Sequence, residues 1–127
     1  MEYDDIEEFD VLTEERAADL KEEVDFIISK LQKTSSMLHD LQMMHETRKE
    51  LRGEIDAISG EKKRDMESIN ISDPKKRKVL EDALTKYYVG ERREIEHKLS
   101  LLNDDLSVLD QNVRETMRNC SVLNNIL

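Results

Sequence analysis

The chain has 127 residues, of which 39% are charged and 37% hydrophobic, and its formal net charge is −10. It contains three Gly, one Pro, one Cys and 4% aromatic residues. This composition lacks the turn and strand residues of a β-sandwich, the Gly-rich turns of a nucleotide-binding fold and the Cys pairs of a disulfide-rich domain. It leaves a long helix, a coiled coil or a disordered acidic chain.

The first segment, residues 1–12, has six acidic residues and no basic one. We expect an acidic tail, or else a short acidic-hydrophobic segment that docks on a partner. The segment lacks the features of a secretory signal, and no run approaches the roughly 18 apolar residues of a membrane span. With its single Cys, the chain is expected to be intracellular and not inserted in a membrane.

A first long helix is predicted over residues 13–60. Thr13 is a suitable N-cap, and Glu14 and Glu15 place negative charge at the positive end of the helix dipole. Apolar side chains then alternate in steps of three and four, which is the a/d spacing of a coiled coil. The predicted seam is Ala17, Leu20, Val24, Ile27, Leu31, Thr34, Leu38 and Leu41.

The pattern changes after Leu41. The next seam positions are His45, Arg48 and Arg52. The apolar stripe moves to Met44, Leu51, Ile55 and Ile58. This shift predicts a break in heptad phase, followed by a helix end at Gly60 and a polar connector over 61–73.

A second long helix is predicted over residues 74–127, because Ser72 and Asp73 are capping residues and Pro74 suits the first helical position. Its seam is Ile95, Leu99, Leu102, Leu106, Leu109, Val113, Thr116, Cys120, Leu123 and Leu127.

The two apolar halves coincide if the chain reverses near residue 72. Ala17 then lies opposite Leu127, and Met44 lies opposite Ser100. The predicted fold is all-α, with two long helices in an antiparallel coiled-coil hairpin. Two helices bury little surface, so we expect partner helices to complete a three- or four-helix bundle. The residues expected to receive them form an outer row: Phe26, Ile28, Leu101, Val108 and Val122.

No catalytic, cofactor or metal site is predicted. The three His residues form no i, i+4 pair, and the chain has no Gly-rich phosphate loop and no nucleophile motif. Cys120 falls on a seam position, where a Cys serves as a small core residue. We therefore expect a non-enzyme without cofactors.

One basic run stands out: Pro74, Lys75, Lys76, Arg77, Lys78 and Val79. It resembles a monopartite nuclear import signal, and the resemblance implies an import receptor as a partner. The alternatives are a solvated basic helix start, or contact with phosphate or an acidic protein. Nucleic-acid binding is disfavoured, because acidic residues are interspersed and the whole chain is acidic.

The functional hypothesis is a non-catalytic scaffold subunit that assembles with other helical proteins in a larger intracellular complex. A hetero-oligomer is favoured over a homodimer, and the nucleus slightly over the cytoplasm. The alternatives are a subunit of a cytoplasmic trafficking or tethering complex, and an acidic helical chaperone or adaptor acting as a homodimer. Residues 46–98 contain 14 basic and 13 acidic residues, so the acidic excess lies in the rest of the chain.

Overall fold

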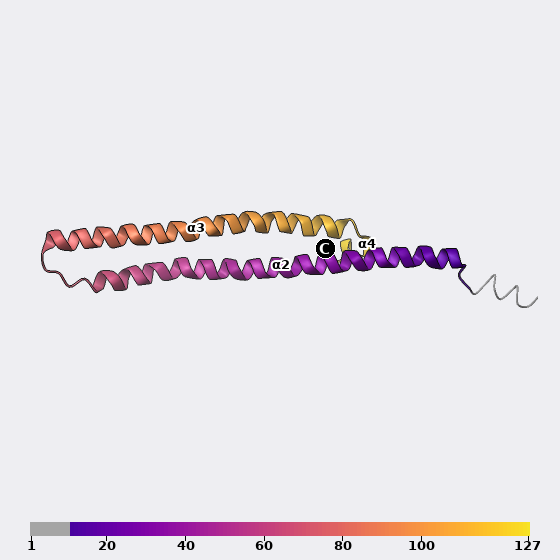
Figure 1. The fold of residues 1–127 in the computed structure, drawn as a ribbon, viewed down its shortest axis with the longest axis horizontal. Coiled ribbons are helices and arrows are strands. Elements are labelled where there is room, and N and C mark those ends of the chain that lie inside the picture. Colours follow the sequence, from indigo (N-terminus) through magenta and orange to yellow (C-terminus); the bar gives the residue numbers. More distant parts are fainter. Residues whose placement is uncertain (1–10) are drawn as a thin grey trace, which may run out of the picture. The chain divides into compact units, whose positions relative to one another are not determined.

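The computed structural model describes residues 11–127, which form three helices and no strand. They are α2 (Glu14–Glu67), α3 (Pro74–Arg118) and α4 (Ser121–Asn124), shown in Figure 1. The predicted all-α class is confirmed. The chain divides into two compact units, and the divisions fall inside both long helices. The described part of the terminal unit is 11–37 with 113–127, and the hairpin unit is 38–112.

The hairpin unit confirms the antiparallel arrangement of the two helices. Its segments of α2 and α3 lie side by side and are joined at one end by the connector 68–73 (Figure 1). Ile58, Tyr88 and Leu106 are buried between them. The Tyr87 ring meets the Tyr88 ring edge-on, with 5.1 Å between their centroids. The ring contact lies within α3, so apolar burial between the two helices holds this unit together.

The terminal unit is built from the start of α2, the end of α3 and α4. Its buried side chains are Thr34, Val113, Thr116, Met117, Cys120 and Leu123. The Thr116 hydroxyl contacts the Met37 sulfur at 4.0 Å, which places the end of α3 beside α2. The first turns of α2 extend beyond α4 (Figure 1). These turns have no neighbouring helix in the described part of this unit.

The buried side of α2 follows one unbroken period of seven residues, so the predicted phase break is wrong. One row of half-buried or buried positions is Leu20, Ile27, Thr34, Leu41, Arg48, Ile55 and Lys62. The other row is Lys30, Met37, Met44, Leu51 and Ile58. Of the three basic residues that break the predicted seam, only Arg48 lies in these rows, while His45 and Arg52 are exposed.

The predicted seam differs from the structure on one side of α2. Val24, Leu31 and Leu38 are 51%, 40% and 41% exposed. The apolar stripe on this part of α2 is wider than one neighbouring helix can cover. The helix keeps one heptad phase, so the row that contains Met44 and Leu51 faces α3. The row of Val24, Leu31 and Leu38 is left exposed to solvent.

The seam of α3 lies against α2 as far as the helix continues. Half-buried or buried positions in α3 are Ile95, Leu99, Leu102, Leu106, Leu109, Val113 and Thr116, and those beyond its end are Cys120 and Leu123. The helix ends at Arg118 rather than at 127, and Cys120 has an extended backbone before α4 begins. Leu127, the last predicted seam residue, is consequently 51% exposed.

The first helix ends later than the sequence predicts, and the pairing of the two helices is also displaced. α2 passes through Gly60, which has no positive φ, and ends at Glu67. Asp65 contacts Tyr88 in the hairpin unit, and Met37 contacts Thr116 in the terminal unit. A reversal near residue 72 would instead pair Asp65 with position 79. The connector runs on past the end of α2 before α3 returns beside it (Figure 1), which accounts for the offset.

Thr34 gives a test of this packing. Its side chain is 2% exposed, and its hydroxyl has no hydrogen-bond partner among residues 11–127. Thr34→Val should raise the free energy of unfolding by about 1–2 kcal/mol, because an unsatisfied buried hydroxyl is replaced by a methyl group. Urea unfolding followed by circular dichroism measures this change.

Thr47 provides the matched control. It is exposed, and its hydroxyl donates to the Met43 carbonyl at 3.1 Å. Thr47→Val should change stability by less than about 0.5 kcal/mol. A loss of stability in Thr34→Val would contradict the packing described for the terminal unit.

Candidate interaction surfaces

The terminal unit exposes large apolar side chains on α2. Val24, Phe26, Ile28 and Leu31 are between 40% and 57% exposed. The Lys30 ammonium lies 5.5 Å from the centre of the Phe26 ring, so this ring is covered on one face by a flexible side chain. On the C-terminal side of the same unit, Val122, Ile126 and Leu127 are also exposed. Such a concentration of apolar surface is typical of a protein interface.

The hairpin unit exposes a second apolar row on α3. Leu101 and Val108 are 52% and 60% exposed. They lie seven residues apart, so they occupy the same side of the helix in successive heptads. The side of α3 that faces α2 is formed by other residues, including Leu102 and Leu106. Leu101 and Val108 therefore remain available for a helix other than α2.

The predicted outer row is thus divided between the two units. Phe26, Ile28 and Val122 belong to the terminal unit, whereas Leu101 and Val108 belong to the hairpin unit. All five side chains are exposed.

A polar side chain interrupts the seam of the hairpin unit. Arg48 is half-buried, and its Nε has no hydrogen-bond partner among the described residues. It lines a shallow hollow together with Leu41, Leu106 and Asp110. A buried guanidinium nitrogen without an acceptor opposes folding, so the Nε of Arg48 does not stabilise this part of the seam. The sequence pattern indicated a seam position here but not the missing partner.

A hydrogen bond between Tyr88 and Asp65 links α3 to α2. The Tyr88 hydroxyl donates to Asp65 Oδ2. This bond, with burial and the negative charges of Asp65 and Glu61, raises the pKa of Tyr88 to about 12. No local sequence pattern indicates this partner, because the carboxylate lies 23 residues away along the chain.

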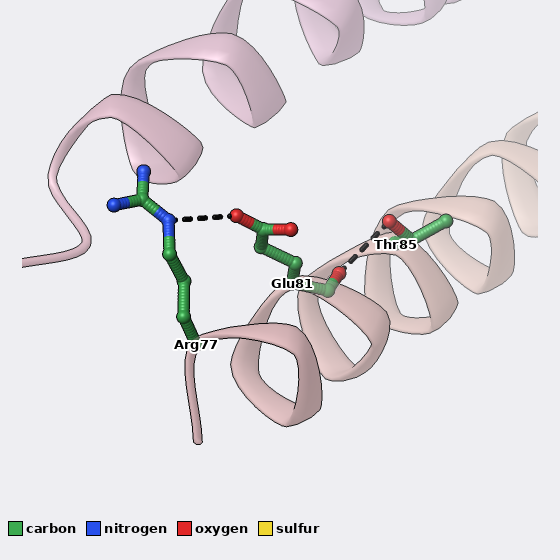
Figure 2. Close-up of polar contacts among 3 residues, drawn as sticks. All are labelled: Arg77, Glu81 and Thr85. Atoms are coloured by element: carbon green, nitrogen blue, oxygen red, sulfur yellow. Dashed lines mark hydrogen bonds and ion pairs between the residues drawn. The ribbon is translucent and has the colours of Figure 1, made fainter. Parts of the chain in front are cut away.

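The basic run at the start of α3 is folded as a capped helix. Asp73 Oδ1 accepts a hydrogen bond from the Lys75 backbone amide at 3.0 Å. Figure 2 shows Arg77 Nε bonded to Glu81 at 3.0 Å, while the Thr85 hydroxyl donates to the Glu81 carbonyl at 2.9 Å. Residues 74–79 are all exposed. The cluster is therefore accessible, but it is helical rather than extended.

Residues 11–127 contain no group of three or more His, Cys, Asp or Glu side chains placed to hold a metal ion. No helix within this described range has the length and apolar character needed to span a bilayer. Comparisons with protein-family models, with curated proteins and with solved structures give no match to this chain.

The Tyr88–Asp65 bond predicts a change in alkaline titration. Asp65→Asn removes the charge and weakens the acceptor, so the pKa of Tyr88 should fall from about 12 toward its ordinary value of 10.0. Ring carbon shifts of labelled Tyr residues, followed by NMR against pH, measure this pKa. The exposed Asp56 is the control, and Asp56→Asn should leave the Tyr88 titration unchanged.

The same bond makes stability depend on pH. The Tyr88 pKa is raised on folding, so its contribution is complete below pH 10 and is lost as the pH rises through about 12. The stability difference between the natural chain and Asp65→Asn should therefore be constant from neutral pH to pH 10 and shrink above pH 10. A difference that grows above pH 10 would contradict the described bond.

Proposed function

We propose that this chain is a non-catalytic coiled-coil subunit that builds a larger complex by packing helix on helix. The observation that supports this most directly is the heptad-spaced apolar row of Leu101 and Val108, exposed on the outer side of α3. A helix that only had to fold with α2 would gain nothing from this second row, because polar residues there would keep it soluble.

The mechanism of assembly follows from the spacing of the exposed residues. Side chains seven residues apart form successive layers of a coiled coil, in which each inserts between four residues of a facing helix. A partner helix lying along α3 would contact Leu101 in one layer and Val108 in the next. It would convert the two-helix hairpin unit into a three-helix bundle and cover surface that one chain leaves in water.

Other helical proteins are the proposed partners, in a hetero-oligomer rather than a homodimer alone. Apolar surface is exposed on both units, so one partner need not occupy all of it. Scaffold complexes of the nucleus and tethering complexes of the cytoplasm both use such subunits. An acidic helical adaptor that acts only as a homodimer is the alternative from a different class.

Replacement of the two exposed apolar residues of α3, Leu101 and Val108, tests the proposal. The tagged chain is purified from its own cells, and proteins that copurify in fixed ratio are identified and quantified by mass spectrometry. Leu101→Glu with Val108→Glu should release these partners and leave the helix content and melting temperature unchanged, since both side chains are exposed.

The matched control uses two other exposed apolar residues of α3 outside the basic run, Leu80 and Val89. Leu80→Glu with Val89→Glu adds the same charge but should retain the partners. If no protein copurifies in fixed ratio, or if both double variants retain the same partners, the subunit proposal fails. A purified homodimer without further partners would support the adaptor alternative.

We also propose that residues 74–79 serve as a nuclear import signal, because this basic run is accessible. Binding in an extended form would require the first turn of α3 to unwind. The side chains of Arg77 and Glu81 are 49% and 41% exposed, so this pair opposes unwinding by less than about 1 kcal/mol. Four basic residues at a helix N-terminus also oppose the helix dipole.

Replacing the four basic residues of this run, Lys75, Lys76, Arg77 and Lys78, by Ala tests import. The variant should remain folded by circular dichroism and lose its nuclear accumulation by fluorescence microscopy of the tagged chain. Lys62→Ala with Lys63→Ala is the control and should keep the natural distribution. An unchanged distribution in the fourfold variant would refute the import proposal.

A further inference from the structure

The start of α2 is a helix with an apolar side and no helix against it. Leu20 and Ile27 are half-buried, while Val24 and Leu31 are exposed. These four positions have a/d spacing over residues 20–31. In the terminal unit, the first turns of α2 extend beyond α4 (Figure 1). The apolar side of these turns is therefore uncovered in the described part of the unit.

Charge is distributed unevenly along this part of α2. Residues 14–25 contain six acidic and two basic side chains, and one of the basic ones, Lys21, is paired with Asp25. Residues 26–37 contain two basic side chains, Lys30 and Lys33, and no acidic one. The segment 14–37 is thus acidic in its first half and basic in its second half.

We propose that a second copy of this chain packs antiparallel along the start of α2, with the apolar positions of residues 20–31 facing those of the partner. This inference rests on the proposed function, because it assigns an occupant to one of the exposed apolar faces. An antiparallel pair about residues 25 and 26 places the acidic half of each copy on the basic half of the other. A parallel pair would instead place like charges together, which opposes association.

The apolar positions match in the same arrangement. Leu20 faces the partner's Leu31, and Val24 faces the partner's Ile27, so each copy contributes the same four side chains to a symmetric seam. Glu23 and Lys30 flank this seam. Glu23 lies beside the partner's Lys30, and the two-fold symmetry repeats this pair at the other end.

The outer row of the hairpin unit remains available in this dimer. Leu101 and Val108 are not part of the proposed seam, and they belong to the other unit. Dimerisation through α2 is therefore compatible with partners of different sequence on α3, and each dimer would offer two copies of that row.

The mass of the purified full chain tests the dimer. Light scattering after size exclusion, or sedimentation equilibrium, should give twice the monomer mass of 14.9 kDa at micromolar concentration. Val24→Glu with Leu31→Glu should give the monomer mass with unchanged helix content. Leu101→Glu with Val108→Glu should remain dimeric. A monomeric natural chain, or a dimer that survives Val24→Glu with Leu31→Glu, overturns the proposal.

A charge exchange tests the antiparallel arrangement. Glu23→Lys places Lys opposite Lys at both ends, and Lys30→Glu places Glu opposite Glu. Each single variant should weaken the dimer about tenfold. Combining the two changes in one chain should restore the natural affinity, and so should mixing the two single variants. Glu46→Lys, on the exposed side of α2 in the hairpin unit, should have no effect.

The outcomes separate this inference from the proposed function. If mixing the two single variants does not restore the natural affinity of the dimer, the pairing of Glu23 with the partner's Lys30 is wrong. This result does not depend on what binds to α3. If the dimer behaves as expected but the Leu101 and Val108 variant loses no partner, the scaffold proposal fails and the dimer stands.

Discussion

Burial that repeats every seven residues on both long helices is the constraint on which the rest of the structure depends. Each helix presents a narrow row of side chains to its neighbour, and where the apolar stripe is wider than this row, some apolar residues stay uncovered. On α2 the row includes Met37, Met44 and Leu51. Apolar side chains on either side of it, such as Val24 and Phe26, stay in water until another helix arrives.

The hairpin and the seam of α3 could be predicted from the sequence. In α3, closely spaced Leu residues mark a single side of the helix as the one that faces α2. The sequence was insufficient for α2, where two adjacent apolar rows compete and the choice depends on residues further along the helix. It also misplaced the end of this helix. One Gly costs about 1 kcal/mol in a helix interior, and the packing on either side of Gly60 outweighs that cost.

The exposed apolar row of α3 could be predicted, because Leu101 and Val108 repeat with the helix period outside the seam. The polar contacts could not. Asp65 meets Tyr88 only because the connector shifts the pairing of the two helices, and no local pattern encodes that shift. Arg48 likewise acquires its half-buried position from the phase of the whole helix rather than from its own neighbours.

The Tyr88–Asp65 bond has a consequence for how the chain folds. A seam that repeats every seven residues also permits pairing displaced by one repeat, with much of its apolar contact preserved. Such a displacement would bring Tyr88 opposite Ile58 or Ser72, where no carboxylate is present. The correct alignment forms close to the connector, between residues near in sequence, so it can nucleate quickly. A misaligned hairpin would lack the Tyr88–Asp65 bond, so this bond favours the native alignment over its neighbours.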